Sequence, residues 1–153
     1  MRKARNSYQQ LFDLHENPLN YGLLARINFS HTGANPLCGD VIRIDAYINK
    51  HQRISKVKWG GRGCFLSQAA ASLLTEEIKG MTLQEVQAFS ELRLFSLLGV
   101  PLNTYKLKCA LLPLQVLQAG AFCGSGPPGW PECEAYAYHF SSCNVSVKGN
   151  LAS

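Results

Sequence analysis

The first apolar positions of the chain recur with nearly helical spacing. They predict a short amphipathic helix over residues 5–16, from "RNSYQQLFDLHE". The stretch "ENPLNYG" follows, and its Pro18 and Gly22 are residues that end helices and open turns. The chain is therefore expected to begin with one helix and then to leave it through a loop.

Alternation of apolar and polar positions predicts three strands after that loop. The pattern is clearest over Asp40–Ile48, where every second residue is apolar. Leu24–Ser30 is predicted as a strand before it, and Ile54–Trp59 as a strand after it. Because the links "HTGANP" and "NKHQ" are short, the three strands are expected to form an antiparallel meander.

The composition becomes helical after the glycine-rich stretch "GGRGC". Ser67 is placed as the N-cap of a first helix, and Gly80 as the residue that stops it. Thr82 and Glu85 have the spacing of a capping box and start a second helix, "TLQEVQAFSELRLFSLLG". The stretch "VPLNTYKLK" is predicted as a loop that leads into a third helix over residues 110–122.

The order of these elements predicts the fold class. A helix, a strand meander and then helices are typical of an α+β two-layer domain, with a three-stranded antiparallel sheet covered on one face by helices. We expect this domain to occupy residues 1–122. Residues 123–153 have no clear period and are predicted to be an irregular tail, which carries Cys123, Cys133 and Cys143.

Composition and charge narrow the class of protein. Of the 153 residues, 46% are hydrophobic and 16% charged, which is ordinary for a globular domain. No apolar run approaches the ~18 residues that a membrane span requires, and the first residues have no apolar signal core. We therefore expect a cytoplasmic chain that does not enter a membrane.

The net charge of +5 raises the question of nucleic-acid binding. The basic residues are scattered along the chain and are not concentrated among aromatic residues, so nucleic acid is not predicted as a partner. A scattered positive charge is explained by solubility, or by docking to an acidic protein.

Three cysteines of the patterned region lie at predicted element boundaries. Cys38 precedes a strand, Cys64 lies just before a helix, and Cys109 immediately precedes the last helix. The start of a helix favours thiolate, which is both the metal-binding and the nucleophilic form of cysteine. Asp40 would complete a set of four ligands suited to zinc or iron. The spacing alone leaves two alternatives open: a shared metal or sulfur site, and three unrelated thiols.

The glycines near Cys64 allow a second interpretation. Gly60, Gly61 and Gly63 could form a phosphate cradle, but no Gly-Lys-Ser/Thr follows them, which excludes a P-loop. We expect them instead to let the backbone bring Cys64 close to Cys38.

The histidines offer weaker signals. His15 and His31 stand alone in the sequence and are predicted to be surface or capping residues. His139 with Cys133 and Cys143 could form a second metal site, but these residues have no zinc-finger context, and that site is not predicted.

The segments around the three cysteines resemble a known family. The stretches "YQQLFDLHENPLNYG", "NPLCGDVIRID", "GGRGCFLSQAAASLLTEEIKG" and "YKLKCALLPLQVL" are similar, in this order, to segments of the U-type iron–sulfur assembly proteins (SufU, IscU and the NifU N-terminal domain). The resemblance covers about residues 7–121. It implies a scaffold that receives sulfur from a cysteine desulfurase and passes a [2Fe–2S] cluster to apo-proteins.

The resemblance also implies roles for particular residues. A zinc ion or a nascent cluster would be held by Cys38, Asp40, Cys64 and Cys109. Cys38 is the first choice of sulfur acceptor, by similarity to the SufU branch, and Cys109 is the second, by similarity to the IscU branch. Asp40, as the weaker oxygen ligand, would leave to open the site.

Departures from the family leave one alternative function. Lys108 stands where IscU proteins have histidine, as in the SufU branch, and could contact a persulfide or cluster sulfide. The insertion of the SufU branch between the second and third cysteines is missing. The Leu-Pro-Pro-Val-Lys segment that an Hsp70-type chaperone binds in IscU is replaced by "PLNTYK", so chaperone-driven release is not expected. The alternative is a zinc-dependent sulfurtransferase that relays sulfur without building a cluster.

Overall fold

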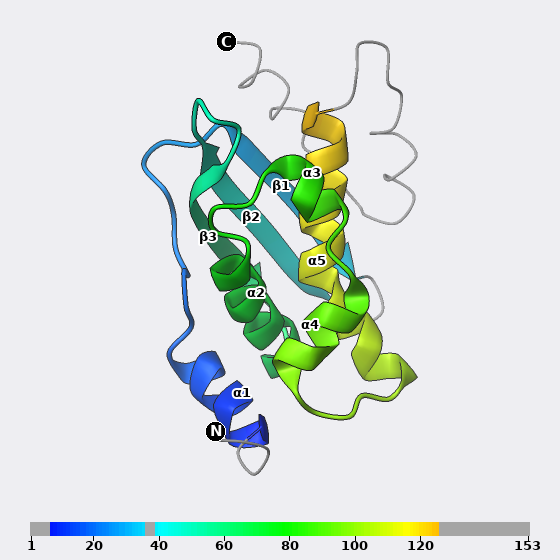
Figure 1. Ribbon diagram of the computed structural model, residues 1–153. Helices are drawn as coiled ribbons and strands as arrows, with labels where there is room; N and C mark the ends of the chain where they lie inside the picture. The colour runs from blue at the N-terminus through cyan, green and yellow to red at the C-terminus, as the bar shows by residue number, and fades with distance from the viewer. Residues whose placement is uncertain (1–6, 36–38, 126–153) are drawn as a thin grey trace.

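The fold is two layers, a three-stranded sheet and a set of helices on one of its faces, in a computed structural model (Figure 1). The structure describes residues 7–35 and 39–125. The elements in chain order are α1 (Ser7–Glu16), β1 (Phe29–Asn35), β2 (Asp40–Ile48), β3 (Ile54–Arg62), α2 (Phe65–Glu77), α3 (Leu83–Gln87), α4 (Glu91–Leu98) and α5 (Thr104–Ser125). The predicted α+β architecture is confirmed.

The sheet is the predicted antiparallel meander, in the order β1-β2-β3. Asn35 pairs with Asp40 at one end of the β1–β2 ladder, and Val41 pairs with Arg62 at the same end of the β2–β3 ladder. This end of the sheet therefore brings together the last residue of β1, the first residues of β2 and the last residues of β3. The bounds predicted for the central strand are those observed.

The first strand lies five residues later than predicted. The segment 24–28 is a loop, and the supposed turn "HTGANP" supplies most of β1, whose Ser30 and His31 are buried. The side chain of Asn28 makes both hydrogen bonds that a strand neighbour would make with Ile48, at 2.9 and 2.8 Å. Because this side chain takes the place of backbone pairing, the ladder begins only at Phe29.

The third strand runs three residues further than predicted, through Gly60 and Gly61 to Arg62. Gly61 has φ +124°, and a Cβ atom there would lie 2.0 Å from the carbonyl oxygen of Val41. Only glycine fits this approach of β3 to β2. Glycines that suggested a turn are thus part of the sheet.

The apolar core lies between the sheet and the helices. Helix α5 packs on both β1 and α2, and α1 covers the outer side of α2 (Figure 1). The largest side chains that are fully buried include Trp59, Phe29, Leu11, Ile42, Ile44, Leu66, Leu74 and Leu94. Within the described ranges, no helix is both long enough and apolar enough to cross a membrane.

All three later helices differ from their prediction, and the first of them, α2, has Cys64 as its N-cap and Ile78 as its C-cap instead of Ser67 and Gly80. The stretch predicted as one helix is two, α3 and α4, because the side chain of Ser90 accepts a hydrogen bond from the Arg93 amide and starts a new helix. The capping box of Thr82 and Glu85 is confirmed, with both reciprocal bonds, at 2.9 and 3.1 Å. The last helix starts at Thr104 rather than at residue 110.

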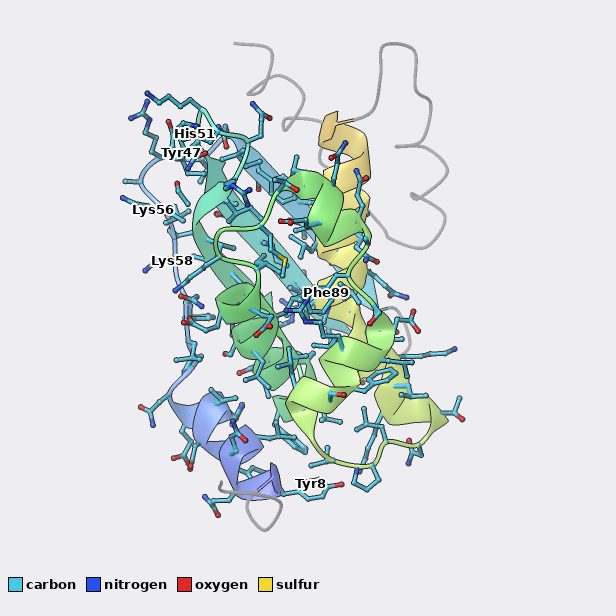
Figure 2. The ribbon with its side chains drawn as sticks, in the orientation of Figure 1. Tyr8, Tyr47, His51, Lys56, Lys58 and Phe89 are labelled. Carbon is cyan, nitrogen blue, oxygen red and sulfur yellow. The ribbon has the colours of Figure 1, made fainter. Side chains whose placement is uncertain are left out.

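The face of the sheet away from the helices is basic. Lys56 and Lys58 of β3 point away from the helical layer (Figure 2). Arg43 forms a 2.5 Å ion pair with Asp45, which is buried and also accepts a 2.7 Å hydrogen bond from the Ser30 hydroxyl. The one acidic side chain of β2 on this face is therefore neutralised within the sheet.

Candidate metal centre

Three side chains of ligand type converge at the end of the sheet described above. The carboxylate of Asp40 and the sulfur atoms of Cys64 and Cys109 lie within 4.8 Å of one another. They come from the first residue of β2, the residue before α2 and the first third of α5. Three of the four predicted ligands are thus brought together, and the fourth, Cys38, lies outside the described residues.

Asp40 is held by the backbone of its neighbour. Asp40 is only 4% exposed, and its Oδ1 atom accepts a 3.3 Å hydrogen bond from the Cys64 amide. The other oxygen, Oδ2, is buried and has no hydrogen-bond partner among the described residues. A buried carboxylate oxygen without a partner is costly, and a cation supplies the missing interaction.

Cys64 is itself the N-cap of α2, three residues earlier than the predicted cap, Ser67. Its backbone is extended (φ −72°, ψ 170°), and its side chain makes no capping hydrogen bond. The Gln68 side-chain amide donates a 2.9 Å hydrogen bond to the Gly63 carbonyl, which fixes the loop that carries Cys64. The sulfur is therefore not used to build the helix and is left for other chemistry.

Cys109 lies inside a helix, not in front of one. The side chain of Asn103 accepts a hydrogen bond from the Lys106 amide at 2.9 Å, and α5 therefore begins at Thr104. Cys109 is 3% exposed, and like Cys64 it is not in a disulfide. Its thiol therefore does not lie at a helix start, contrary to the prediction, and its position is due to the packing of α5 on α2 and β1.

The donor set fits a thiophilic metal. Two thiolates and a carboxylate suit zinc and iron, and a tetrahedral zinc site separates its sulfur atoms by about 3.7 Å. The three donor atoms, which lie within 4.8 Å of one another, are close to this spacing. The Oδ2 atom of Asp40, which has no hydrogen-bond partner among the described residues, and the Cys64 sulfur, which makes a long 3.9 Å hydrogen bond to the Ser67 hydroxyl, are donor atoms that such a metal would use.

Lys108 is exposed beside Cys109 on α5. Its contact with a persulfide or a cluster sulfide stays a prediction.

Two residues near the site were missed or misjudged in the sequence. A Cβ atom at position 63 would lie 2.4 Å from the Ser67 hydroxyl oxygen and 2.9 Å from the Asp40 carboxyl carbon, so this position requires glycine. Among the described residues the close approach is that of Gly63 to Asp40 and Ser67; the predicted approach of Cys64 to Cys38 involves Cys38, which lies outside the described residues. Ser67, predicted as a cap, is instead a fully buried hydroxyl beside Cys64, with Oγ 3.9 Å from the sulfur.

Two of the three histidines among the described residues, His15 and His31, differ from each other in burial. His15 is exposed as predicted, and its ring nitrogen shares a 3.1 Å hydrogen bond with the Gln68 side chain. His31 is not a surface residue: it is fully buried in β1, opposite Ile44, and neither ring nitrogen has a partner among the described residues. Burial lowers the pKa of His31 from 6.5 to about 4. The two-residue spacing between Phe29 and His31, which places both on the same face of the strand, was the sequence signal that could have indicated the burial of His31.

Comparisons with known proteins agree with this geometry. Residues 7–123 match the family model of the NifU-like N terminal domain. The iron-sulfur cluster assembly scaffold protein IscU of Azotobacter vinelandii is 32% identical over 114 residues, which are 72% of this chain and 87% of that protein. The mitochondrial iron sulfur cluster assembly protein 1 of Schizosaccharomyces pombe is 33% identical over 112 residues, 71% of this chain but only 57% of that protein.

A solved structure shows the same fold. It is described as a putative iron-sulfur cluster assembly scaffold protein for the SUF system, from Fervidobacterium islandicum. It has a TM-score of 0.64 and 24% sequence identity, and the match covers 78% of this chain and 99% of that one.

Proposed function

Because the chain belongs to the NifU-like N-terminal domain family, we propose that it is a scaffold on which an iron–sulfur cluster is assembled and then passed to apo-proteins. The observation that carries the proposal is the convergence of Asp40, Cys64 and Cys109 at one end of the sheet. Cys38, two residues before Asp40 in the sequence, is proposed as the fourth ligand.

The proposed sulfur donor is the persulfide of a cysteine desulfurase. A thiolate of the scaffold attacks the outer sulfur of that persulfide, the sulfur–sulfur bond of the donor breaks, and the donor cysteine leaves as a thiolate. Cys38 is the first choice of acceptor and Cys109 the second. The burial of Cys109 supports this order, because a side chain only 3% exposed is poorly placed to meet a large partner.

Asp40 is proposed as the ligand that leaves. Its oxygen binds soft iron less firmly than a thiolate does. Its Oδ1 atom already has a second partner, the Cys64 amide, which can hold the carboxylate when it is not bound to metal. The carboxylate thus keeps one hydrogen bond, at Oδ1, when the site opens, whereas Oδ2 is left without a partner among the described residues, which favours return of the metal.

The cargo is proposed to be a [2Fe–2S] cluster. Ferrous iron comes from solution. The two sulfane sulfurs take up four electrons when they become sulfide; oxidation of the two ferrous ions to ferric iron supplies two, and an external electron-transfer protein must supply the other two. The acceptors are apo iron–sulfur proteins. The cytoplasm stays the predicted compartment, although the fission-yeast relative is named as a mitochondrial protein.

Anaerobic reconstitution tests the proposal. The full chain is incubated with a cysteine desulfurase, cysteine, ferrous iron and a reductant, and bound iron and acid-labile sulfide are then measured. Equal amounts of the two, a visible absorption band, and transfer to an apo-ferredoxin are expected. The Cys64→Ser variant should lose most of this capacity, and Ser72→Ala, a change in the same helix, should retain it.

The alternative is a relay of sulfur at a zinc site. Tightly bound zinc, sulfane sulfur on the protein and no stable cluster under these conditions would refute the scaffold and support the zinc-dependent sulfurtransferase. The same donor set serves both, so this measurement decides between them.

A further inference from the structure

Ser67 is a buried hydroxyl that lies next to one of the proposed ligands. It is fully buried in the first turn of α2, and its Oγ atom lies 3.9 Å from the sulfur of Cys64. The hydroxyl donates a 3.1 Å hydrogen bond to the Cys64 carbonyl. It therefore has two possible acceptors on one residue, an oxygen and a sulfur.

The packing around Gly63 keeps the hydroxyl at this place. A Cβ atom on Gly63 would lie 2.4 Å from the Ser67 hydroxyl oxygen and 2.9 Å from the carboxyl carbon of Asp40. Ser67 and Asp40 thus border the same point from two elements, with the backbone of the Cys64 loop against both. The hydroxyl belongs to the surroundings of the site as closely as the carboxylate does.

The state of the sulfur decides what it can offer to Ser67. A Cys64 thiol can donate a weak hydrogen bond to the Ser67 hydroxyl oxygen, while the hydroxyl donates to the Cys64 carbonyl. This is the arrangement in the structure. A metal-bound sulfur has lost that hydrogen to water and can only accept. Rotation of the hydroxyl hydrogen, with a small movement of the side chain, would then give a hydrogen bond to a charged acceptor, which is stronger than one to a carbonyl.

We infer that Ser67 is a positioning residue for the metal centre, whose hydroxyl donates a hydrogen bond to the Cys64 sulfur when that sulfur is bound to metal. The inference rests on the proposed function. Such hydrogen bonds fix the orientation of a ligand and withdraw electron density from sulfur, and in iron–sulfur proteins they help to set the reduction potential. Ser67 would thus adjust how firmly Cys64 holds its metal.

A purely structural role for Ser67 predicts something different. If the hydroxyl served only to tie the first turn of α2 to the Cys64 carbonyl, its loss would lower stability and leave the electronic state of the sulfur unchanged. Ser72 is the matched control. It lies five residues further along α2 and is also fully buried, and its hydroxyl oxygen accepts a 3.1 Å hydrogen bond from the Leu19 amide.

Cobalt(II) provides the probe, because thiolate-to-cobalt charge transfer reports directly on the sulfur. The full chain and its variants Ser67→Ala, Ser67→Thr and Ser72→Ala are titrated anaerobically with cobalt, and zinc affinity is measured by competition with a chelator. Circular dichroism checks that each variant is folded. We expect Ser67→Ala to bind zinc about tenfold more weakly and to move the charge-transfer band to longer wavelength. Ser67→Thr, which keeps the hydroxyl, should move the band less.

Each outcome bears on one claim. A Ser67→Ala variant whose band and zinc affinity match those of Ser72→Ala would overturn the role of Ser67 and leave the metal centre intact. A wild-type chain that shows no thiolate charge transfer with cobalt would overturn the proposed metal centre, and the role of Ser67 with it. A band shift in Ser67→Ala alone supports both.

Discussion

The buried imidazole of His31 makes a specific prediction about stability and pH. The ring lies in β1 against α5, where a Cβ atom on Gly120 would be 2.8 Å from the Cβ atom of His31. Both ring nitrogens are buried, and neither has a partner among the described residues, so that the protonated ring would be a buried charge without compensation. This is why burial lowers the pKa of His31 to about 4.

The magnitude follows from proton linkage. In the unfolded chain the imidazole takes up a proton near its ordinary pKa of about 6.5, whereas in the folded chain it resists protonation until about pH 4. Its contribution is fully present above about pH 6.5 and is lost as the pH falls toward 4. The loss is about 2 kcal/mol between pH 7 and pH 5, and about 3 kcal/mol by pH 4.

Urea denaturation, followed by circular dichroism at pH 7, 6 and 5, measures this loss. A chelator is present throughout, because metal binding is itself pH-dependent. The variant His31→Phe removes the titrating group, so its free energy of unfolding should fall less between pH 7 and 5, by about 2 kcal/mol, than that of the wild type. Phe29→Leu is the control. Because it keeps His31, it should lower the free energy of unfolding relative to the wild type by the same amount at each pH. Parallel profiles for wild type and His31→Phe would refute the reasoning, as would a nuclear magnetic resonance titration of His31 near pH 6.5.

Two further substitutions test the loop beside the metal centre and a helix start. Gly63→Ala places a methyl group 2.4 Å from the Ser67 hydroxyl oxygen and 2.9 Å from the Asp40 carboxyl carbon, so that one of them must move, and zinc affinity should fall by at least about tenfold in the chelator competition; an unchanged affinity would show that this contact does not position Asp40. Thr82→Ala removes the acceptor of the Glu85 amide at the start of α3, far from the cysteines, and should cost about 1 kcal/mol in urea denaturation with zinc affinity unchanged. A loss of zinc binding in Thr82→Ala would contradict the separation of the helix cap from the site.

The parts of the fold that local signals determine could be predicted. The alternation over Asp40–Ile48 gave the central strand with its observed bounds, and the pair Thr82 and Glu85 gave a real capping box. The first strand was misplaced because its buried members are polar. His31, Gly33 and Asn35 have the composition of a turn, and only pairing with β2 makes them part of a strand.

The candidate metal centre was predictable in part as a set of residues but not as a geometry. The similarity of the segments around the cysteines named Asp40, Cys64 and Cys109, and the structure brings these three together. The reason given for Cys109 was wrong, because Asn103 starts α5 earlier than the polar stretch "VPLNTYKLK" suggested. Ser67 could not be recognised from the sequence, since its closeness to the sulfur depends on Cys64 being the cap residue.

The most direct test of the account is the lifetime of a reconstituted cluster in Asp40→Ala. Iron, acid-labile sulfide and the rate of transfer to an apo-ferredoxin are compared for the wild type, Asp40→Ala and the exposed-site control Asp13→Ala. If Asp40 is the ligand that opens the site, Asp40→Ala should hold its cluster longer and transfer it more slowly, while Asp13→Ala behaves as the wild type does. An Asp40→Ala variant with wild-type metal content and wild-type cluster lifetime would contradict the role of Asp40.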